Sequence, residues 1–143
     1  MRLSVKVLDP GLSLPRYARA GDAGLDLLAA EDVALEPGAR AAVSTGIAIA
    51  VPRGYAGFVH ARSGRALDEG LALANAPGLI DSGYRGEVKV IVVNLDPTRL
   101  ILIKRGEKIA QLVLQPVEEA RMEVVDELPA SDRGESGFGS SGR

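Results

Sequence analysis

Apolar side chains alternate with polar or small ones in two stretches of the chain. The first stretch runs from Leu3 to Val7 and the second from Ile47 to Val51. Successive side chains of a β-strand point to opposite faces of the sheet, so a two-residue period is typical of a strand with one buried face. Both stretches therefore predict half-buried strands.

Three other stretches are β-branched and almost continuously apolar. They are "VKVIVVNL" (residues 88–95), "LILI" (100–103) and "IAQLVL" (109–114). Runs of this kind are typical of strands that are buried on both faces. We expect one of these faces to be covered by another subunit.

Turn signals separate these strands at spacings that are typical of a β-sandwich or barrel. The signals pair proline or glycine with charged residues, and they are Glu36-Pro-Gly38, Pro52-Arg-Gly54, Asp96-Pro-Thr98 and Lys104-Arg-Gly106. The sequence therefore predicts an all-β fold without internal repeats.

Two segments depart from the strand pattern. "SGRALDEGLAL" (residues 63–73) predicts one short helix, with Ser63 as its cap. After Pro129 the chain is rich in Ser, Gly and charge, with a single aromatic residue. We therefore expect a β domain over residues 1–129 and a flexible, glycine-rich C-terminal arm over residues 130–143.

Composition narrows the classes of function. The chain has 143 residues, of which 46% are hydrophobic, which suits one compact domain. Its net charge of -2 argues against binding to a nucleic-acid polymer, which needs a clustered excess of Lys and Arg. No apolar run is long enough for a signal peptide or a membrane span, and cysteine is absent. We expect a cytoplasmic protein without membrane contact.

Five short clusters rich in Gly, Asp, Arg or Ser follow one another along the chain. Each alone resembles an ordinary loop, but their order is specific. They are "AGDAGLDL" (20–27), "ARSG" (61–64), "NAPGLIDSGYRGE" (75–87), "RGEKIAQL" (105–112) and "RGESGFGSSG" (133–142). Together they resemble the ordered motifs of the homotrimeric deoxyuridine triphosphate pyrophosphatases (dUTPases). The resemblance covers residues 20–142.

The "ARSG" cluster suits a phosphate. Arg62 and Ser63 stand where the predicted helix begins, and a helix N-terminus offers free N–H groups to an anion. A triphosphate also calls for Mg²⁺, which prefers oxygen ligands and keeps several waters. Asp26 and Gln111 are suitable partners for such water. Without the resemblance, a capped helix with a surface arginine is the favoured explanation of "ARSG", and an outward-facing strand residue explains Gln111 nearly as well.

The third cluster suits a pyrimidine base. We expect residues 78–86 to form a hairpin whose backbone N–H and C=O groups face outward, where they match the donors and acceptors of uracil. Asp81 lies on the same turn, and Tyr84 follows it. Taken alone, Tyr84 is more typical of hairpin packing.

The resemblance implies a role for each matching residue. It implies a jelly-roll-like fold, a homotrimer with sites between subunits, Mg²⁺ as cofactor, and hydrolysis of dUTP to dUMP and pyrophosphate. Asp81 would orient the attacking water, Tyr84 would pack on the deoxyribose, and Asp26 and Gln111 would hold Mg²⁺ through water. The remaining residues implied to bind substrate are Arg62, Ser63, Gly64, Asn75, Gly78, Leu79, Ile80, Lys89, Gln111, Arg133, Phe138, Gly139, Ser140 and Ser141.

Two rival functions stay open from the sequence. A deoxycytidine triphosphate deaminase shares the fold, and Glu87 is its obvious acid/base candidate here. A nucleotide-binding module without turnover is the second rival. His60, the one histidine, precedes "ARSG" on a strand, and we expect it to be structural. Ser136 stands where the family commonly has glycine, so the backbone path of the arm can differ there.

Overall fold

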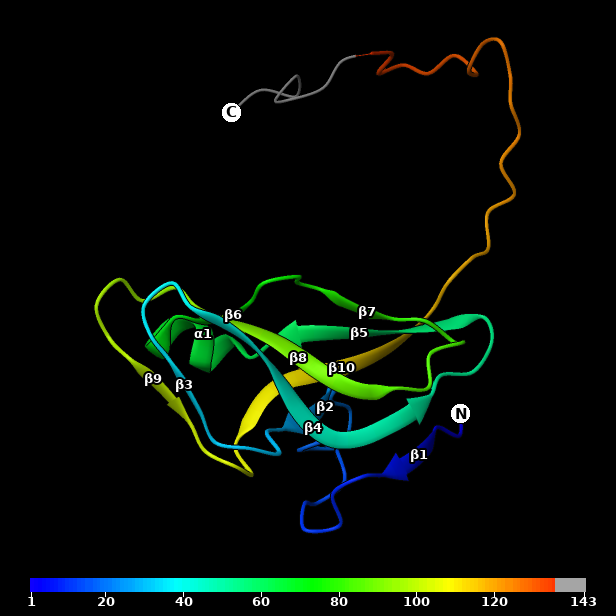
Figure 1. The fold of residues 1–143 in the computed structure, drawn as a ribbon. Helices are drawn as coiled ribbons and strands as arrows, with labels where there is room; N and C mark the ends of the chain where they lie inside the picture. The colour runs from blue at the N-terminus through cyan, green and yellow to red at the C-terminus, as the bar shows by residue number, and fades with distance from the viewer. Residues whose placement is uncertain (136–143) are drawn as a thin grey trace.

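A computed structural model describes residues 1–135 of the chain, which contain ten strands and one helix (Figure 1). The elements are β1 (Ser4–Val7), β2 (Leu25–Leu28), β3 (Val33–Leu35), β4 (Arg40–Ala50), β5 (Tyr55–Ala61), α1 (Ser63–Glu69), β6 (Leu71–Leu73), β7 (Gly78–Ile80), β8 (Glu87–Asn94), β9 (Ile101–Ile103) and β10 (Lys108–Pro116).

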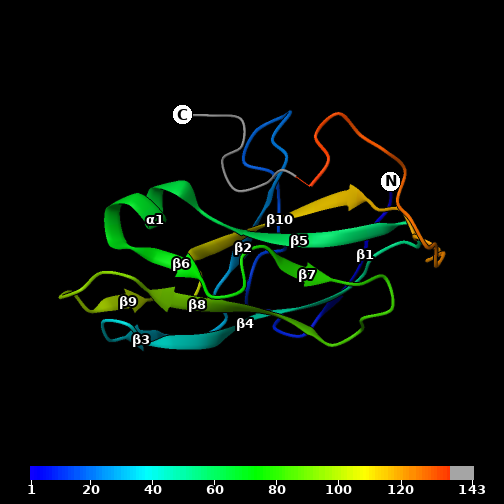
Figure 2. The same ribbon diagram turned by 90° about the horizontal axis from the view of Figure 1, so that it is seen from above.

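The strands form two four-stranded sheets and one small pair, and every strand pairing is antiparallel. One sheet has the order β1-β4-β8-β6, the other has the order β2-β10-β5-β7, and β3 pairs with β9. The two larger sheets lie in layers, with α1 at one end (Figure 2). The prediction of an all-β, jelly-roll-like fold is confirmed.

The core lies between the layers and is built from alternate strand residues. On β8, Val88, Val90 and Val92 are buried, whereas Lys89 and Ile91 are exposed. Within one chain, β8 and β9 each bury alternate residues on one face, and the expectation that another subunit covers the second face stays a prediction. The outer faces of these strands are not covered within the described residues. On β10 the run Ile109 to Leu112 is largely buried.

The N-terminal strand also differs from its prediction. β1 forms and pairs with β4 through Val5 opposite Ile49, but all four of its residues are exposed. The prediction of one buried face is wrong for β1, which is an edge strand of its sheet. The two-residue period therefore predicted the strand correctly, but it did not predict which of its residues are buried.

The predicted helix is shorter than expected. α1 ends at Glu69 because Gly70 adopts a left-handed conformation with φ of 75°. A Cβ at Gly70 would lie 2.8 Å from the backbone nitrogen of Asp96, so no larger residue fits there. The next residues form the strand β6. Arg62, and not Ser63, occupies the N-cap position, and no side chain caps the helix.

The described C-terminal segment leaves the sandwich after β10. Residues 117–135 contain no helix or strand, and they run away from the two layers (Figure 1). Several apolar side chains of this segment are exposed, and these are Val117, Met122, Val124, Val125 and Leu128. Within residues 1–135, no helix has the length and apolar character needed to cross a membrane.

Candidate active site

Three of the predicted site residues meet on neighbouring strands of one sheet. Asp26 on β2 stands opposite Gln111 on β10, and the Gln111 amide nitrogen donates to Asp26 Oδ1 at 3.3 Å. Arg62 follows the end of β5, and its Nε lies 3.4 Å from the same oxygen. The chain therefore gathers a carboxylate, an amide and a guanidinium at one end of the sheet.

Lys108 joins this group and was not predicted. Its Nζ lies 2.7 Å from Asp26 Oδ2. The pairing of β10 with β2 is irregular between Lys108 and Ala110, and this shift places Lys108 beside the carboxylate. Lys108 lies within the quoted cluster "RGEKIAQL", but strand alternation alone does not place its side chain on the face of Gln111.

Asp26 is a buried carboxylate that stays charged. Its side chain is only 4% exposed. Burial alone would raise the pKa of Asp26, but the hydrogen bond from Lys108, the charges of Arg62 and Lys108 and the bond from Gln111 outweigh burial and lower it. Asp26 is therefore an anion at neutral pH and orients the groups around it.

Two glycines fit this end of the sheet for different reasons. A Cβ at Gly24 would lie 3.0 Å from Cβ of Gln111, so glycine allows β2 to approach Gln111 closely. A Cβ at Gly64 would have no neighbour within 4 Å. Gly64 and the neighbouring Ser63 are exposed, so a ligand can approach the backbone at the start of α1.

The residues fit Mg²⁺ only as partners for its water. Among residues 1–135, no three His, Cys, Asp or Glu side chains are grouped to hold a metal. Both oxygens of Asp26 already have protein partners, from Arg62, Gln111 and Lys108. These residues therefore suit hydrogen bonds to the water ligands of a magnesium ion that is bound to phosphates.

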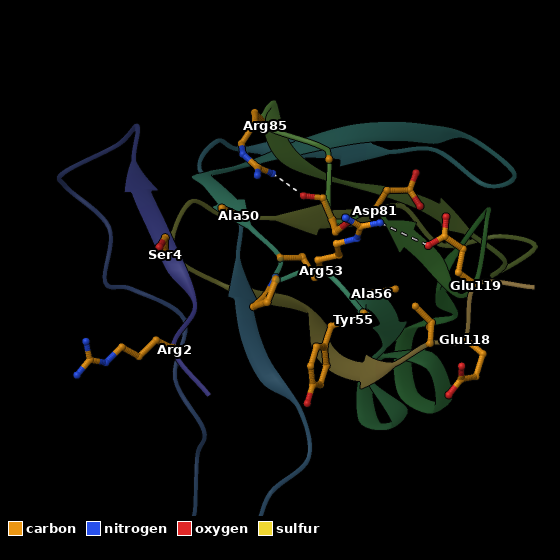
Figure 3. A pocket seen from close by; sticks show the side chains of 16 residues that line it. Arg2, Ser4, Ala50, Arg53, Tyr55, Ala56, Asp81, Arg85, Glu118 and Glu119 are labelled. Carbon is orange, nitrogen blue, oxygen red and sulfur yellow. Dashed lines mark hydrogen bonds and ion pairs between the residues drawn. The ribbon is translucent and has the colours of Figure 1, made fainter.

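Asp81 lies in a separate cleft of about 670 Å³. It directly follows β7, and its carbonyl oxygen accepts a hydrogen bond from the backbone nitrogen of Tyr84 at 3.1 Å. Figure 3 shows Asp81 near the pair formed by Arg53 and Glu119, whereas the side chain of Arg2 points away from it. The Asp81 carboxylate is exposed and accessible to water.

The segment predicted as a hairpin is a corner between the two sheets. β7 pairs with β5 in one sheet, and β8 pairs with β4 and β6 in the other. The hairpin prediction is therefore wrong, although the turn from Asp81 to Tyr84 is present. β7 is an edge strand, so the backbone groups on its outer side have no neighbouring strand in residues 1–135.

The predicted base-binding residues surround this edge. Gly78 and Ile80 are buried and Leu79 is exposed. Asn75 is exposed, and its amide lies beside Gly78, 3.4 Å from where a Cβ would stand. These residues present backbone edges and one amide to solvent.

Tyr84 is held over a glycine. Its hydroxyl donates to the carbonyl of Glu87 at 2.9 Å, and a Cβ at Gly86 would lie 2.6 Å from the ring carbon Cζ. A side chain at position 86 would therefore displace this ring from its present position. The carboxylate of Glu87 accepts a hydrogen bond from the backbone nitrogen of Gly46 at 3.0 Å. Glu87 is the acid/base candidate of the deaminase alternative, and this hydrogen bond already occupies one of its carboxylate oxygens.

Other predicted residues lie elsewhere. Lys89 is exposed on the outer face of β8. His60 stands opposite Gln111 on β5 and is exposed, so it does not belong to the core. Arg133 lies in the described C-terminal segment. Phe138, Gly139, Ser140 and Ser141, together with Ser136, lie outside the described residues.

One chain does not bring the two parts of the site together. Ile80, which precedes Asp81, pairs with Gly57 near the start of β5, whereas Arg62 follows the end of β5. The five residue steps from Gly57 to Arg62 span about 16 Å at roughly 3.3 Å per step. Figure 2 shows α1 at one end of β5, with β7 directed toward the other end.

Comparisons with known sequences all relate this chain to one enzyme family. The sequence model of the dUTPase family matches residues 11–142. The deoxyuridine 5'-triphosphate nucleotidohydrolase of Thermobifida fusca is 58% identical over 142 residues, which cover 99% of this chain and 79% of that protein. The enzyme of the same name from Mycobacterium marinum is 54% identical over 145 residues, covering 98% and 94%.

Solved structures agree with the sequences. The Staphylococcus bacteriophage 80alpha dUTPase with dUPNHPP superposes with a TM-score of 0.92 at 32% identity, covering 99% of both chains. A mutant dUTPase from phage phi11 of S. aureus, described with a coordinated structural Mg(II) ion, gives 0.84 at 27% identity, covering 91% of this chain and all of that one. With the matching motifs, sheets and relatives in agreement, the chain belongs to the dUTPase family.

Proposed function

We propose that this chain hydrolyses dUTP to dUMP and pyrophosphate. The observation that carries this proposal is that relatives named deoxyuridine 5'-triphosphate nucleotidohydrolase are more than half identical over almost the whole chain. Such a reaction limits the incorporation of uracil into DNA and supplies dUMP for thymidylate synthesis.

The group around Asp26 binds the triphosphate in this proposal. Arg62 contributes a charged fork, and Ser63 and Gly64 contribute the exposed start of α1. Gln111 is held by Asp26, so its amide is oriented before substrate arrives. Arg133, Phe138, Gly139, Ser140 and Ser141 would close over the nucleotide as part of the arm formed by residues 130–143.

The β7 edge binds the base, and Tyr84 contacts the sugar. The outer backbone groups of Gly78, Leu79 and Ile80 offer a fixed pattern of donors and acceptors, and Asn75 adds an amide beside them. Cytosine reverses part of that pattern and would leave buried groups unpaired at a cost of about 1–3 kcal/mol each. The fixed ring of Tyr84 packs on the deoxyribose, where a 2′-hydroxyl would clash.

Asp81 is the water-orienting residue. Its carboxylate accepts a hydrogen bond from a water molecule and takes the proton as the water oxygen bonds to the α-phosphorus. The bond from that phosphorus to the bridging oxygen breaks, and pyrophosphate leaves with the electron pair. Lys89, on β8, also binds the substrate in this proposal. General-base assistance of this kind typically contributes about 10²–10⁴ in rate.

Mg²⁺ is the cofactor, and Asp26 and Gln111 would hold it through water. When bound, the ion supplies positive charge that offsets the negative charge of the phosphates. Asp26 keeps its own charge at neutral pH because its pKa is lowered, so it can accept hydrogen bonds from the waters of the ion.

The complete site requires more than one copy of the chain. Asp81 and Arg62 are near opposite ends of β5, so a phosphate chain held by Arg62 is out of reach of Asp81 in the same chain. Exposed apolar residues on β1, β8, β9 and the segment 117–135 provide surface for neighbouring copies. A homotrimer with sites between subunits satisfies both observations, and a cytoplasmic location completes the proposal.

Four nucleotides test the function together. The protein is incubated with Mg²⁺ and dUTP, dTTP, dCTP or UTP in separate reactions, and pyrophosphate and ammonia are measured. The proposal predicts pyrophosphate from dUTP alone and no ammonia. Ammonia from dCTP would indicate a deaminase instead, and dUTP that is bound but remains intact would indicate a binding module.

A further inference from the structure

Strand β4 carries a bulge opposite the start of β8. Ser44 stands opposite Lys89 and Ala48 stands opposite Glu87, so β4 has three residues between these two pairs where β8 has one. A bulge leaves backbone groups without a partner in the ladder of the sheet. Gly46 lies in this bulge with φ of 70° and is buried, so its N–H group needs another acceptor.

The side chain of Glu87 supplies that acceptor. Its Oε1 accepts a hydrogen bond from the backbone nitrogen of Gly46 at 3.0 Å. Next to it, the Thr45 hydroxyl donates to the carbonyl of Val88 at 2.5 Å. The carbonyl of Gly46 in turn accepts from the backbone nitrogen of Leu8 at 2.8 Å. Side-chain bonds therefore tie the first two residues of β8 to the bulge, where the regular ladder is interrupted.

Glu87 also holds the ring of Tyr84, through its main chain. The Tyr84 hydroxyl donates to the Glu87 carbonyl at 2.9 Å. The Arg85 guanidinium donates to the carbonyl of Tyr84 at 2.7 Å, so this bond stays within the turn of residues 81–87. The bond between Glu87 and Gly46 instead links the turn to another strand. The position of the ring on the protein therefore depends on Glu87 at both its side chain and its carbonyl.

We infer that Glu87 is a positioning residue for selectivity toward the sugar, and that it acts through Tyr84. This inference rests on the proposed function, in which Tyr84 packs on the deoxyribose. A ring excludes a 2′-hydroxyl only while its position is fixed, because a ring that shifts gives the extra oxygen room. The reach of the Glu87 side chain matters here and its charge does not, since an amide oxygen accepts the same hydrogen bond.

Three substitutions of Glu87 separate reach from charge. Glu87→Gln keeps the length and one acceptor oxygen, Glu87→Asp keeps the charge on a shorter side chain, and Glu87→Ala removes both. Glu31→Ala is a matched control, because the Glu31 carboxylate also accepts from a backbone nitrogen of β4, that of Ser44, at 3.1 Å. Glu31 lies outside the turn that carries Tyr84.

The measurement is the ratio of kcat/KM for dUTP to kcat/KM for UTP, with Mg²⁺. We expect Glu87→Ala and Glu87→Asp to lower this ratio about tenfold. Glu87→Gln and Glu31→Ala should keep the wild-type ratio. The ratio for dUTP to dCTP should change much less in all four variants, because the β7 backbone and not Tyr84 contacts the base. A loss of folded protein alone lowers kcat/KM for every nucleotide equally and leaves both ratios unchanged.

Two results would overturn the inference. One is a wild-type ratio of dUTP to UTP in both Glu87→Ala and Glu87→Asp. The other is a ratio lowered as much by Glu87→Gln as by Glu87→Asp, because the charge would then be responsible. If Glu87→Ala does not fold, Glu87→Asp gives the same test.

A double substitution shows whether Glu87 acts through the tyrosine. Tyr84→Phe removes the hydroxyl that bonds to Glu87, so adding Glu87→Asp to it should lower the ratio of dUTP to UTP no further. A further drop as large as that in the single variant would overturn the inference. A wild-type protein that releases no pyrophosphate from dUTP would instead contradict the proposed function, on which the inference rests.

Discussion

Replacing Asp26 by asparagine tests whether this carboxylate organises the site. The substitution keeps the shape of the side chain but removes the negative charge on which Arg62 and Lys108 converge. The hydrogen bond with Gln111 can persist, because an amide oxygen also accepts. The change therefore isolates the electrostatic part of the arrangement.

The size of the effect follows from how exposed the partners are. Breaking a fully buried ion pair costs about 3–5 kcal/mol, whereas an exposed pair contributes about 1 kcal/mol or less. Arg62 is 31% and Lys108 is 43% exposed, so water can solvate both after the substitution. We expect Asp26→Asn to lower the free energy of unfolding by about 1–2 kcal/mol at pH 7.

The sign of the pH dependence is fixed by the lowered pKa of Asp26. A carboxyl group whose pKa is lower in the folded protein stabilises the fold at pH values above its unfolded pKa of about 3.9. This stabilisation is lost as the pH falls through the folded pKa. The stability difference between wild type and Asp26→Asn should therefore be largest near pH 7 and shrink below about pH 4.

Urea unfolding of both proteins at matched concentration, with EDTA, measures this difference at several pH values. Matched concentration is required because self-association contributes to apparent stability. A difference that stays constant from pH 7 to pH 3, or an Asp26→Asn protein more stable at pH 7, would refute the assigned role of the carboxylate.

Three further substitutions separate chemistry, recognition and folding. Asp81→Asn should lower kcat for dUTP by about 10²–10⁴ while analogue binding stays within a few-fold, and unchanged kcat would refute its role. Tyr84→Ala should relax the rejection of UTP more than that of dCTP, measured as ratios of kcat/KM. Asn94→Leu should lower the free energy of unfolding, measured with urea, by about 2–5 kcal/mol. The reason is that this fully buried amide donates to the carbonyls of Leu35 at 2.9 Å and Arg99 at 2.8 Å. A loss below about 1 kcal/mol would contradict that reasoning.

The strand positions were largely predictable because the two-residue period is a local property of the chain. Burial was less predictable, because it depends on what covers the outer face of a sheet. Ile91 and Leu102 satisfy the pattern of a buried run but lie exposed in the described chain. The helix was also overextended at Gly70, where a close approach to Asp96 from a distant turn decides the end.

The phosphate end of the site was predictable in composition but not in full geometry. Asp26, Arg62 and Gln111 were each identified, and the structure brings them together. Lys108 was missed, because its position beside Asp26 depends on an irregular pairing of β10 with β2, which the local sequence pattern does not predict. The hairpin was wrong for a related reason, since local turn residues do not tell which sheet the next strand joins.

The most direct test of the proposal mixes two inactive proteins. Asp81→Asn removes the water-orienting group and Arg62→Gln removes the phosphate-binding group, and the two parts lie near opposite ends of β5. If each site takes Asp81 from one copy and Arg62 from a neighbouring copy, random co-assembly of equal amounts should restore about a quarter of the wild-type sites. Pyrophosphate release from dUTP by the co-expressed proteins should therefore rise well above that of either variant alone. A mixture no more active than the separate variants would contradict a site that is shared between copies.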